Sequence, residues 1–445
     1  MMTTENAPKE SANLRLQNVI QRNRRAERLG VYSICSAHPS VIDAGLRQAL
    51  ADGSFLLIES TSSQVNQFGG YTGQTPDQFA AAVRLAAQRC GLSEGMLMLG
   101  GDHLGPYPWR DQPSEVALVN ACDLVRACVL AGYGKMHLDA SMACADDNGA
   151  RPSDVVIAER AAMLCRAAES AYAELLPGSP PLLYVIGTEV PTPGGETQPG
   201  EPPEVTTVEE LHCTLQAFRT AFERNGIKQA WEQVIGVVVQ PGVEFGENVI
   251  FDYERRKAQP LSAALPEHPC LVYEAHSTDY QSPTALGHMV EDHFGILKVG
   301  PALTFGFREA IFALSAIESE CFAGKRGLQL SRVREALEAA MLRNPSYWSS
   351  YYRGTEKEQQ FARAFSYSDR CRYYWCDRAV QEELGRLYGN LSGSSLPPTV
   401  ISQYLPSEYE AIRSGRLSAD PKAMIEDHIR VVLRRYAAAC GTLSG

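Results

Sequence analysis

The sequence predicts an α/β protein, a TIM (β/α)8 barrel with a helical C-terminal extension. Eight short apolar runs, each followed by a segment with helical spacing, occupy residues 30–324. This alternation is typical of parallel strands joined by crossover helices, and eight such units match a closed barrel. A doubly wound open sheet is the alternative, but it would carry a glycine-rich turn after its first strand. The first run ends instead in the sequence CSAHP at 35–39.

The individual elements follow from the hydrophobic pattern, because short apolar runs bounded by turn residues indicate strands and amphipathic stretches indicate helices. The predicted strands are 30–35, 55–59, 96–100, 135–139, 182–188, 234–239, 270–273 and 296–299. The helices predicted to follow them are 39–50, 76–90, 114–130, 154–175, 208–225, 253–265, 284–292 and 304–321.

The two ends of the chain differ in sequence pattern from the barrel segment. Residues 1–29 are a polar tail followed by a helix predicted at 14–29, where apolar residues recur at helical spacing. Residues 325–445 are expected to form helices packed on the barrel, and prolines divide these helices into short pieces. Helical spacing in this extension is found at 332–342, 356–364 and 424–436.

Two further segments each leave two interpretations open. The loop at 190–206 is rich in proline and glycine and follows the fifth predicted strand, so it is either a lid or a solvated surface excursion. The segment 367–375 (YSDRCRYYW) is dense in aromatic and arginine residues. Such a cluster holds a phosphate or a partner surface, or it is the buried seam between extension and barrel.

Composition excludes several classes of function. The 445 residues are 44% hydrophobic, with a net charge of −11. This acidic balance argues against a nucleic-acid or anionic-membrane partner, although a local basic pocket for a phosphate stays open. No apolar run is long enough to span a bilayer, and the N-terminus lacks a signal-peptide pattern. The 12 cysteines include no C-x-x-C pair, so they are expected to be free thiols in a cytoplasmic protein.

Polar residues able to bind a metal or move a proton follow four of the predicted strands. They are Asp102 and His103, then His137 and Asp139, then Glu189, and finally Glu274, His276 and Asp279. Because a parallel barrel gathers the carboxyl ends of its strands at one rim, these groups are predicted to share one site. The alternative for each is a structural turn residue.

The residue types indicate how such a site would be divided. His103, Glu189 and His276 would form a His₂-carboxylate set that suits zinc and leaves a position for substrate oxygens. Asp102 and Glu274 are the candidates for proton transfer. The candidates for substrate binding are Glu59, His137, Asp139, Gln240, Asp279 and Lys298. No G-x-x-x-x-G-K-[ST] motif occurs, so the sequence lacks a P-loop for nucleotide phosphates.

Long motifs along residues 18–440 resemble the GatZ/KbaZ family, described as the non-catalytic subunit of class II tagatose-1,6-bisphosphate aldolase. The motifs that carry the resemblance include YSICSAHP at 32–39, IESTSSQVNQFGGYTG at 58–73, GGDHLGPYPW at 100–109, HLDASMACADD at 137–147, YEAHSTDYQ at 273–281 and SYSDRCRYYW at 366–375. The resemblance implies a barrel related to class II aldolases, and members have often been labelled tagatose-6-phosphate kinases.

In class II aldolases a catalytic aspartate precedes a zinc-binding histidine, and Asp102 and His103 match that pair. His276 matches a further zinc histidine, and Glu189 an acidic residue near the metal. Gln240 stands where the aldolases have another zinc histidine, and residues 276–281 replace their glycine-rich phosphate turn. The resemblance implies a divalent metal, with Zn first and Mn, Co or Ni as alternatives.

Two functions follow from the resemblance, and a tagatose-6-phosphate kinase is a third alternative that the missing nucleotide-phosphate motif disfavours. One is an accessory subunit that stabilises a separate catalytic class II aldolase subunit in tagatose or galactitol breakdown, with a sugar phosphate or ketose bound at the metal site and a homo-oligomer left open. The alternative is a metal-dependent ketose 4-epimerase. In a 2-ketohexose the C4 proton is not next to the carbonyl, so C4 inverts only if the C3–C4 bond is cleaved and remade, which is aldol chemistry.

Overall fold

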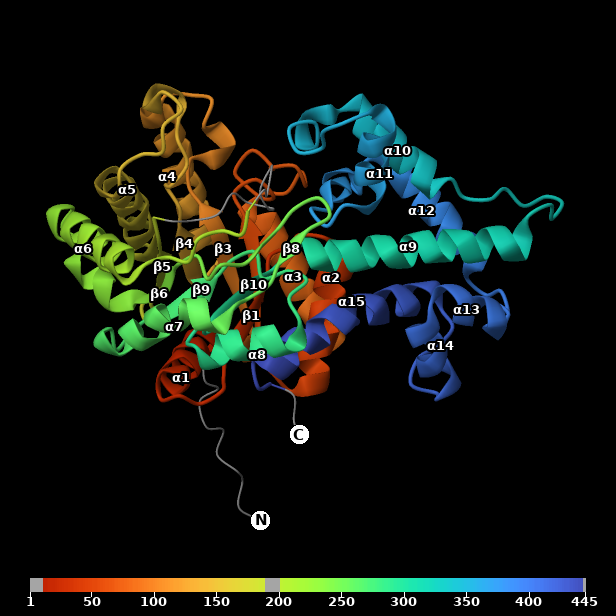
Figure 1. The fold of residues 1–445 in the computed structure, drawn as a ribbon, viewed down its shortest axis with the longest axis horizontal. Coiled ribbons are helices and arrows are strands. Elements are labelled where there is room, and N and C mark those ends of the chain that lie inside the picture. Colours follow the sequence, from red (N-terminus) through yellow and green to blue (C-terminus); the bar gives the residue numbers. More distant parts are fainter. Residues whose placement is uncertain (1–10, 189–200, 443–445) are drawn as a thin grey trace, which may run out of the picture.

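A computed structural model describes residues 11–188 and 201–442 of the chain, and their core is a closed barrel of eight parallel strands (Figure 1). In order around the barrel, the strands are β1 (Val31–Ile34), β2 (Leu56–Thr61), β3 (Leu97–Leu104), β4 (Lys135–Leu138), β5 (Leu183–Ile186), β6 (Val234–Val238), β9 (Val272–Ala275) and β10 (Ile296–Val299). β10 pairs in parallel with β1 and closes the barrel. The predicted TIM barrel is confirmed.

Eight helices follow these strands and surround the barrel, each beginning within a few residues of its predicted start. They are α2 (Pro39–Asp52), α3 (Pro76–Cys90), α4 (Ser114–Leu130), α5 (Asp154–Tyr172), α6 (Val208–Arg224), α7 (Arg255–Ala264), α8 (Pro283–Glu291) and α9 (Pro301–Phe322). Capping chemistry sets several ends: a capping box at Thr207 starts α6, and Gly91, in the left-handed conformation, ends α3.

One small sheet was not foreseen from the sequence. β7 (Glu244–Phe245) and β8 (Ile250–Phe251) pair as an antiparallel hairpin between β6 and α7. Strands of two residues are too short to produce a recognisable alternation of apolar and polar side chains.

The amino-terminal end of the barrel is closed by helix α1 (Ala12–Arg24). Its Leu16 and Ile20 belong to one buried apolar cluster with residues of the strands, including Val31, Leu57 and Met98. Because this cluster fills the barrel at the end where the strands begin, the polar residues of the lumen gather toward the opposite end.

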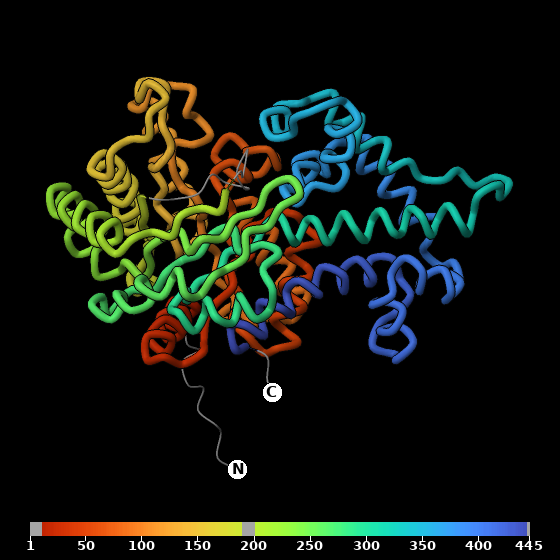
Figure 2. Tube along the Cα trace, viewed as in Figure 1, coloured from red at the N-terminus to blue at the C-terminus, as the bar shows by residue number. Residues whose placement is uncertain are grey.

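The C-terminal extension is helical, as predicted. Its helices are α10 (Val333–Arg343), α11 (Glu356–Phe365), α12 (Arg378–Leu391), α13 (Pro398–Tyr404), α14 (Pro406–Arg413) and α15 (Pro421–Ala439). Helix α9 projects away from the barrel, with α10–α12 on one side of it and α13–α14 on the other (Figure 2). Helix α15 then runs back beside α9 and packs on α2 and α8, so the last helix of the chain belongs to the barrel wall.

The return of α15 to the barrel is fixed by polar contacts near the carboxyl ends of the strands. The hydroxyl group of Tyr436 donates to the carbonyl of Thr278 at 2.8 Å, and Thr278 lies in the loop after β9. At the other end of the barrel, the N–H of Gly30 donates to the carbonyl of Cys440 at 3.1 Å. The final helix therefore holds both a loop at the open end of the barrel and the entry to β1.

Part of the aromatic and arginine segment at 367–375 is a buried seam between extension and barrel. Arg308 of α9 donates from Nε to Asp369 Oδ1 at 2.9 Å, and Thr304 donates to Asp369 Oδ2 at 2.7 Å. The Tyr280 hydroxyl group donates to the carbonyl of Tyr367 at 2.6 Å. A buried ion pair of this kind is costly to break from one side, so the seam fixes the segment against the barrel.

Within the described residues, no helix combines the length and apolar character needed to cross a membrane. The cytoplasmic location expected from the sequence stays a prediction.

His428 of α15 lies between two carboxylates and predicts a pH-dependent stability. Its Nδ1 is 2.9 Å from Glu408 of α14 and its Nε2 is 3.3 Å from Glu309 of α9. Burial opposes protonation, but the two carboxylates outweigh it and raise the pKa of His428 to about 9. Because the folded pKa lies above the ordinary value of about 6.5, the stabilisation is complete below pH ~6.5 and is lost as the pH rises through ~9. His428→Gln should lower the free energy of unfolding by about 1–2 kcal/mol at pH 6 and by nearly nothing at pH 9.5, measured by urea denaturation. A constant difference between these pH values would contradict the assignment.

Candidate metal centre at the carboxyl end of the barrel

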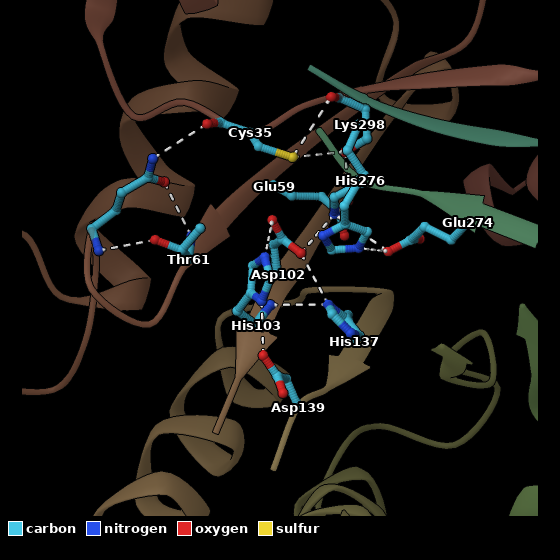
Figure 3. A network of polar contacts seen from close by, with 12 residues as sticks. Cys35, Glu59, Thr61, Asp102, His103, His137, Asp139, Glu274, His276 and Lys298 are labelled. Atoms are coloured by element: carbon cyan, nitrogen blue, oxygen red, sulfur yellow. Dashed lines mark hydrogen bonds and ion pairs between the residues drawn. The ribbon is translucent and has the colours of Figure 1, made fainter. Parts of the chain in front are cut away.

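Three imidazole rings meet at the carboxyl ends of the strands. The ring centres of His103, His137 and His276 lie 4.8 to 5.1 Å apart (Figure 3). His103 comes from β3, His137 from β4, and His276 directly follows β9. All three rings are buried. Histidines separated by up to 173 residues in the sequence therefore form one cluster, as the strand-end pattern predicted.

A break in the regularity of β3 brings Asp102 and His103 to the same cluster. Neighbouring residues of a regular strand point to opposite faces. Here the pairing of β3 with β4 shifts register between Gly101 and Leu104, and His103 has a φ of 46° in the left-handed region. As a result, Asp102 contacts His137 at 3.0 Å while the adjacent His103 contacts Asp139 at 2.8 Å.

Asp139 orients the ring of His103. Its Oδ2 lies 2.8 Å from His103 Nδ1, while its Oδ1 accepts hydrogen bonds from the N–H and the hydroxyl group of Ser141. Burial would raise the pKa of Asp139, but His103 and Ser141 lower it below its usual value. Burial would likewise lower the pKa of His103, but Asp102 and Asp139 raise it. A carboxylate that holds one ring nitrogen leaves the other, Nε2, as a potential metal donor.

His137 carries a hydrogen-bonding conflict. Its Nδ1 lies 3.1 Å from the backbone N–H of His103, which donates to it, and 3.0 Å from the carboxylate of Asp102, which can only accept. One nitrogen cannot both accept the first hydrogen bond and donate the second. Its Nε2 is buried and has no hydrogen-bond partner among the described residues. The unpartnered Nε2 fits a cation in the cluster.

His276 is held by Glu274, whose Oε1 lies 3.0 Å from the ring Nε2. Burial lowers the pKa of His276 to about 3, so its ring is neutral at pH 7 and able to act as a ligand. One ligand atom each from Asp102, His137, Glu274 and His276 lie within 4.8 Å of one another. This donor set of carboxylate oxygens and imidazole nitrogens suits zinc and other divalent metals.

Below the histidines, two lysines and two glutamates cross the lumen as a buried charge network. Lys135 Nζ lies 2.8 Å from both Glu59 and Glu274. Lys298 Nζ pairs with Glu59 and lies 2.8 Å from Asp102. Gly100 of β3 makes room for this arrangement, because a Cβ atom there would lie 2.7 Å from Glu59 Oε1.

The network keeps its carboxylates ionised. Burial opposes ionisation, but His103, Lys298 and His137 lower the pKa of Asp102 well below its usual value. The two lysines and His276 do the same for Glu274. Two lysines face four carboxylates in the cluster, which are Glu59, Asp102, Asp139 and Glu274. The raised pKa of His103 allows this ring to add positive charge, and a divalent cation bound to the neutral ring would take the place of that proton.

The cluster opens into a cavity of about 450 Å³. Asp102, His103, His276 and Lys298 line it from the barrel, and Arg372, Tyr373 and Trp375 line it from the extension. A volume of this size accommodates a small ligand. The arrangement can therefore bind a metal ion and present an ionised carboxylate and an ammonium group to a molecule in the cavity.

The remaining predicted site residues lie in different places. Lys298 and Asp279 line the cavity, but Asp279 Oδ1 accepts hydrogen bonds from the N–H groups of Gly300 and Ala302 at the start of α9. Gln240 is not among the described residues that line the cavity. Its side-chain oxygen caps the turn after β6 by accepting from Gly242 and Val243. Glu189 lies outside the described residues, as does most of the proline-rich loop at 190–206.

Sequence reasoning missed Lys135, although its signal was present. Lys135, His137 and Asp139 alternate along one segment, and alternate residues of a strand share a face. The face that was assigned to His137 and Asp139 therefore also carried the lysine. Arg372 and Tyr373 were seen as part of a cluster but were not placed at the site.

The chain belongs to the family described as D-tagatose-1,6-bisphosphate aldolase subunit GatZ/KbaZ-like, whose model matches residues 16–441. The predicted family is therefore confirmed. A structure from Sinorhizobium meliloti, titled a probable tagatose 6 phosphate kinase, is 42% identical with a TM-score of 0.83, over 92% of this chain and 100% of that one.

Two aldolase structures are also similar, but more distantly. The YdjI aldolase of Escherichia coli is 9% identical with a TM-score of 0.42, over 87% of this chain and 99% of that one. A fructose-bisphosphate aldolase of Campylobacter jejuni is 13% identical with a TM-score of 0.42, over 90% of this chain and 94% of that one.

The buried network predicts a large effect of losing one lysine. Lys135→Met leaves Glu59 and Glu274 with less compensating charge in the lumen, so the free energy of unfolding should fall by about 3–5 kcal/mol at pH 7. Urea denaturation measures this loss. Glu382→Gln is the matched control, because Glu382 pairs with Arg378 on the surface and its loss should change stability little. Equal effects of the two substitutions would show that the network contributes no more than a surface pair.

Proposed function

We propose that the chain is an accessory subunit of a tagatose-bisphosphate aldolase and carries a divalent metal site for a sugar phosphate. His103, His137 and His276 would hold the ion, since each ring has one nitrogen engaged by the protein and a second nitrogen that remains as a donor. Zinc suits three imidazoles. The sequence predicted Glu189 as a ligand together with His103 and His276, and its role stays a prediction. The buried Nε2 of His137, which has no hydrogen-bond partner among the described residues, is the observation that carries the proposal.

The residues around the metal position fit aldol chemistry. A bound metal would supply a Lewis acid that polarises a ketose carbonyl and stabilises the charge formed when the C3–C4 bond breaks. Asp102 is ionised and lines the cavity, so it can accept the proton of a C4 hydroxyl group. Lys298 keeps Asp102 ionised from 2.8 Å and can donate a hydrogen bond to a substrate oxygen. Glu274 orients His276.

A second candidate function is a metal-dependent ketose 4-epimerase, and one observation favours it. Proton acceptor, metal donors and a cavity of about 450 Å³ all occur within this single chain. A purely stabilising subunit needs none of them. Cleavage of the C3–C4 bond, rotation of the aldehyde fragment and re-formation of the bond would invert C4 without a second subunit.

The metal site is tested directly by elemental analysis of the purified protein. We expect about one divalent ion per chain, reduced to a small fraction in His103→Ala and His276→Ala because each removes one imidazole donor. His288→Ala, a histidine of α8 outside the cluster, should keep the full content and serves as the control. Retention of the ion in both cluster variants would place it elsewhere.

The two functions make opposite demands on Asp102. For the accessory role, we expect the chain to lengthen the half-life of a purified catalytic aldolase subunit at raised temperature, and Asp102→Asn to do so equally well. For the epimerase, the metal-loaded chain alone should interconvert tagatose 6-phosphate and fructose 6-phosphate, or the free or uronate ketoses. Asp102→Asn should then lower the rate by about 10²–10⁴-fold.

Each role has its own contradicting result. A catalytic subunit that loses activity at the same rate with and without the chain would count against the accessory role. Unchanged ketoses after prolonged incubation with the metal-loaded chain would remove the epimerase.

A further inference from the structure

The cavity continues from the metal cluster to a wall made by the C-terminal extension. Arg372 and Tyr373 line this wall. They belong to the short helix η7 (Arg370–Tyr374), which the buried ion pair of Arg308 with Asp369 fixes against the barrel. A ligand that reaches from the cluster to this wall would therefore contact two parts of the chain about 270 residues apart, from Asp102 to Arg372.

Arg372 is a cation with no carboxylate in direct contact, although Asp369 and Asp279 interact with its charge at longer range. Among the described residues, it makes no ion pair within 4.0 Å, and its hydrogen bonds go to neutral oxygens. Nη1 donates to the carbonyls of Ser368 and Asp369, the latter at 3.1 Å, and Nη2 donates to the hydroxyl group of Tyr373 at 3.0 Å. A guanidinium has five N–H donors, so two remain. Two donors on one planar group match a carboxylate or phosphate.

Tyr373 adds a third donor beside the guanidinium. Its hydroxyl oxygen accepts hydrogen bonds from Arg370 at 3.2 Å and from Arg372 at 3.0 Å, which leaves its own hydrogen to donate. The ring is stacked on Tyr347 with centroids 4.6 Å apart and meets Tyr71 edge-on at 4.7 Å. Packing on both rings fixes the direction of the hydroxyl group.

The one acidic group on the neighbouring wall already has partners. Asp279 lines the same cavity, but its Oδ1 accepts from the N–H groups of Gly300 and Ala302 and so neutralises the start of α9. Trp375 and Phe245 make parts of the surrounding wall apolar. In such a setting a guanidinium that contacts no carboxylate directly interacts strongly with an anion, because little water competes for it.

We propose that Arg372 and Tyr373 bind the terminal anionic group, a phosphate or a carboxylate, of an open-chain ketose whose carbonyl end lies at the metal cluster. This inference rests on the proposed function for the identity of the ketose. It gives the C-terminal extension a direct role in selecting the substrate.

The test is the affinity of the zinc-loaded protein for three ligands, measured by calorimetry: tagatose 6-phosphate, tagaturonate and free tagatose. Wild-type protein should bind one of the two anionic ketoses at least about tenfold more tightly than free tagatose, since charge-assisted hydrogen bonds are lost with the anion. Tighter binding of the phosphate ester identifies a phosphate site, and tighter binding of the uronate identifies a carboxylate site. Equal affinities for all three ligands would overturn the proposal without any variant.

Arg372→Gln should bring the affinity for the anionic ketose to within about twofold of that for free tagatose, while affinity for free tagatose stays unchanged. Arg372→Lys keeps the charge but loses the planar fork, so it should lose less. Arg378→Gln is the control, because Arg378 lies on α12 with its side chain 93% exposed. An anionic preference that survives in a folded Arg372→Gln protein, with an unchanged melting temperature, would overturn the proposal.

A second measurement separates this inference from the proposed function. His276→Ala is expected to lose the metal, but inorganic phosphate should still raise its melting temperature relative to phosphate-free buffer, because Arg372 is unchanged. Wild-type protein that shows the Arg372-dependent preference but neither turns over a ketose nor stabilises an aldolase would refute the proposed function alone. A metal-loaded, active protein without the preference would refute this inference alone.

Discussion

The arrangement of the site depends on mutual neutralisation of charges inside the barrel. Glu59, Lys135, Glu274 and Lys298 come from four strands, and each carries a charge that would be costly to bury alone. Together they are compensated, and their side chains fill the lumen above the apolar plug supplied by α1. Lys298 also contacts Asp102, and Glu274 also contacts His276. The positions of the histidines therefore depend on the ion pairs in the lumen.

Most of the architecture could be predicted from the sequence, because the alternation of short apolar runs and amphipathic segments is a local signal. The convergence of Asp102, His103, His137 and His276 also followed from topology, since parallel strands end at one rim. The left-handed conformation of His103 could not be foreseen, because a regular strand would have sent it away from Asp102. Lys135 was missed because it stands at the start of β4, whereas polar residues were sought at the carboxyl ends of the strands.

The extension was harder to interpret from the sequence, because its aromatic and arginine residues fit two roles equally well. The structure divides those roles between neighbours. Asp369 pairs with Arg308 in the seam, while Arg372 and Tyr373 face the cavity. The tertiary structure determines which arginine forms an ion pair with a carboxylate, and composition alone does not identify that arginine. Membership of the GatZ/KbaZ-like family covers both parts, as its model matches residues 16–441.

The contact between Tyr436 and Thr278 has a consequence for folding during synthesis of the protein. The loop that follows His276 is held by a helix translated about 160 residues later. A growing chain on the ribosome can form the strands early, yet it lacks this clamp until synthesis is nearly finished. The rim that carries the histidine cluster is therefore completed last, and a nascent or prematurely terminated polypeptide would expose an incomplete cavity to solvent and to chaperones.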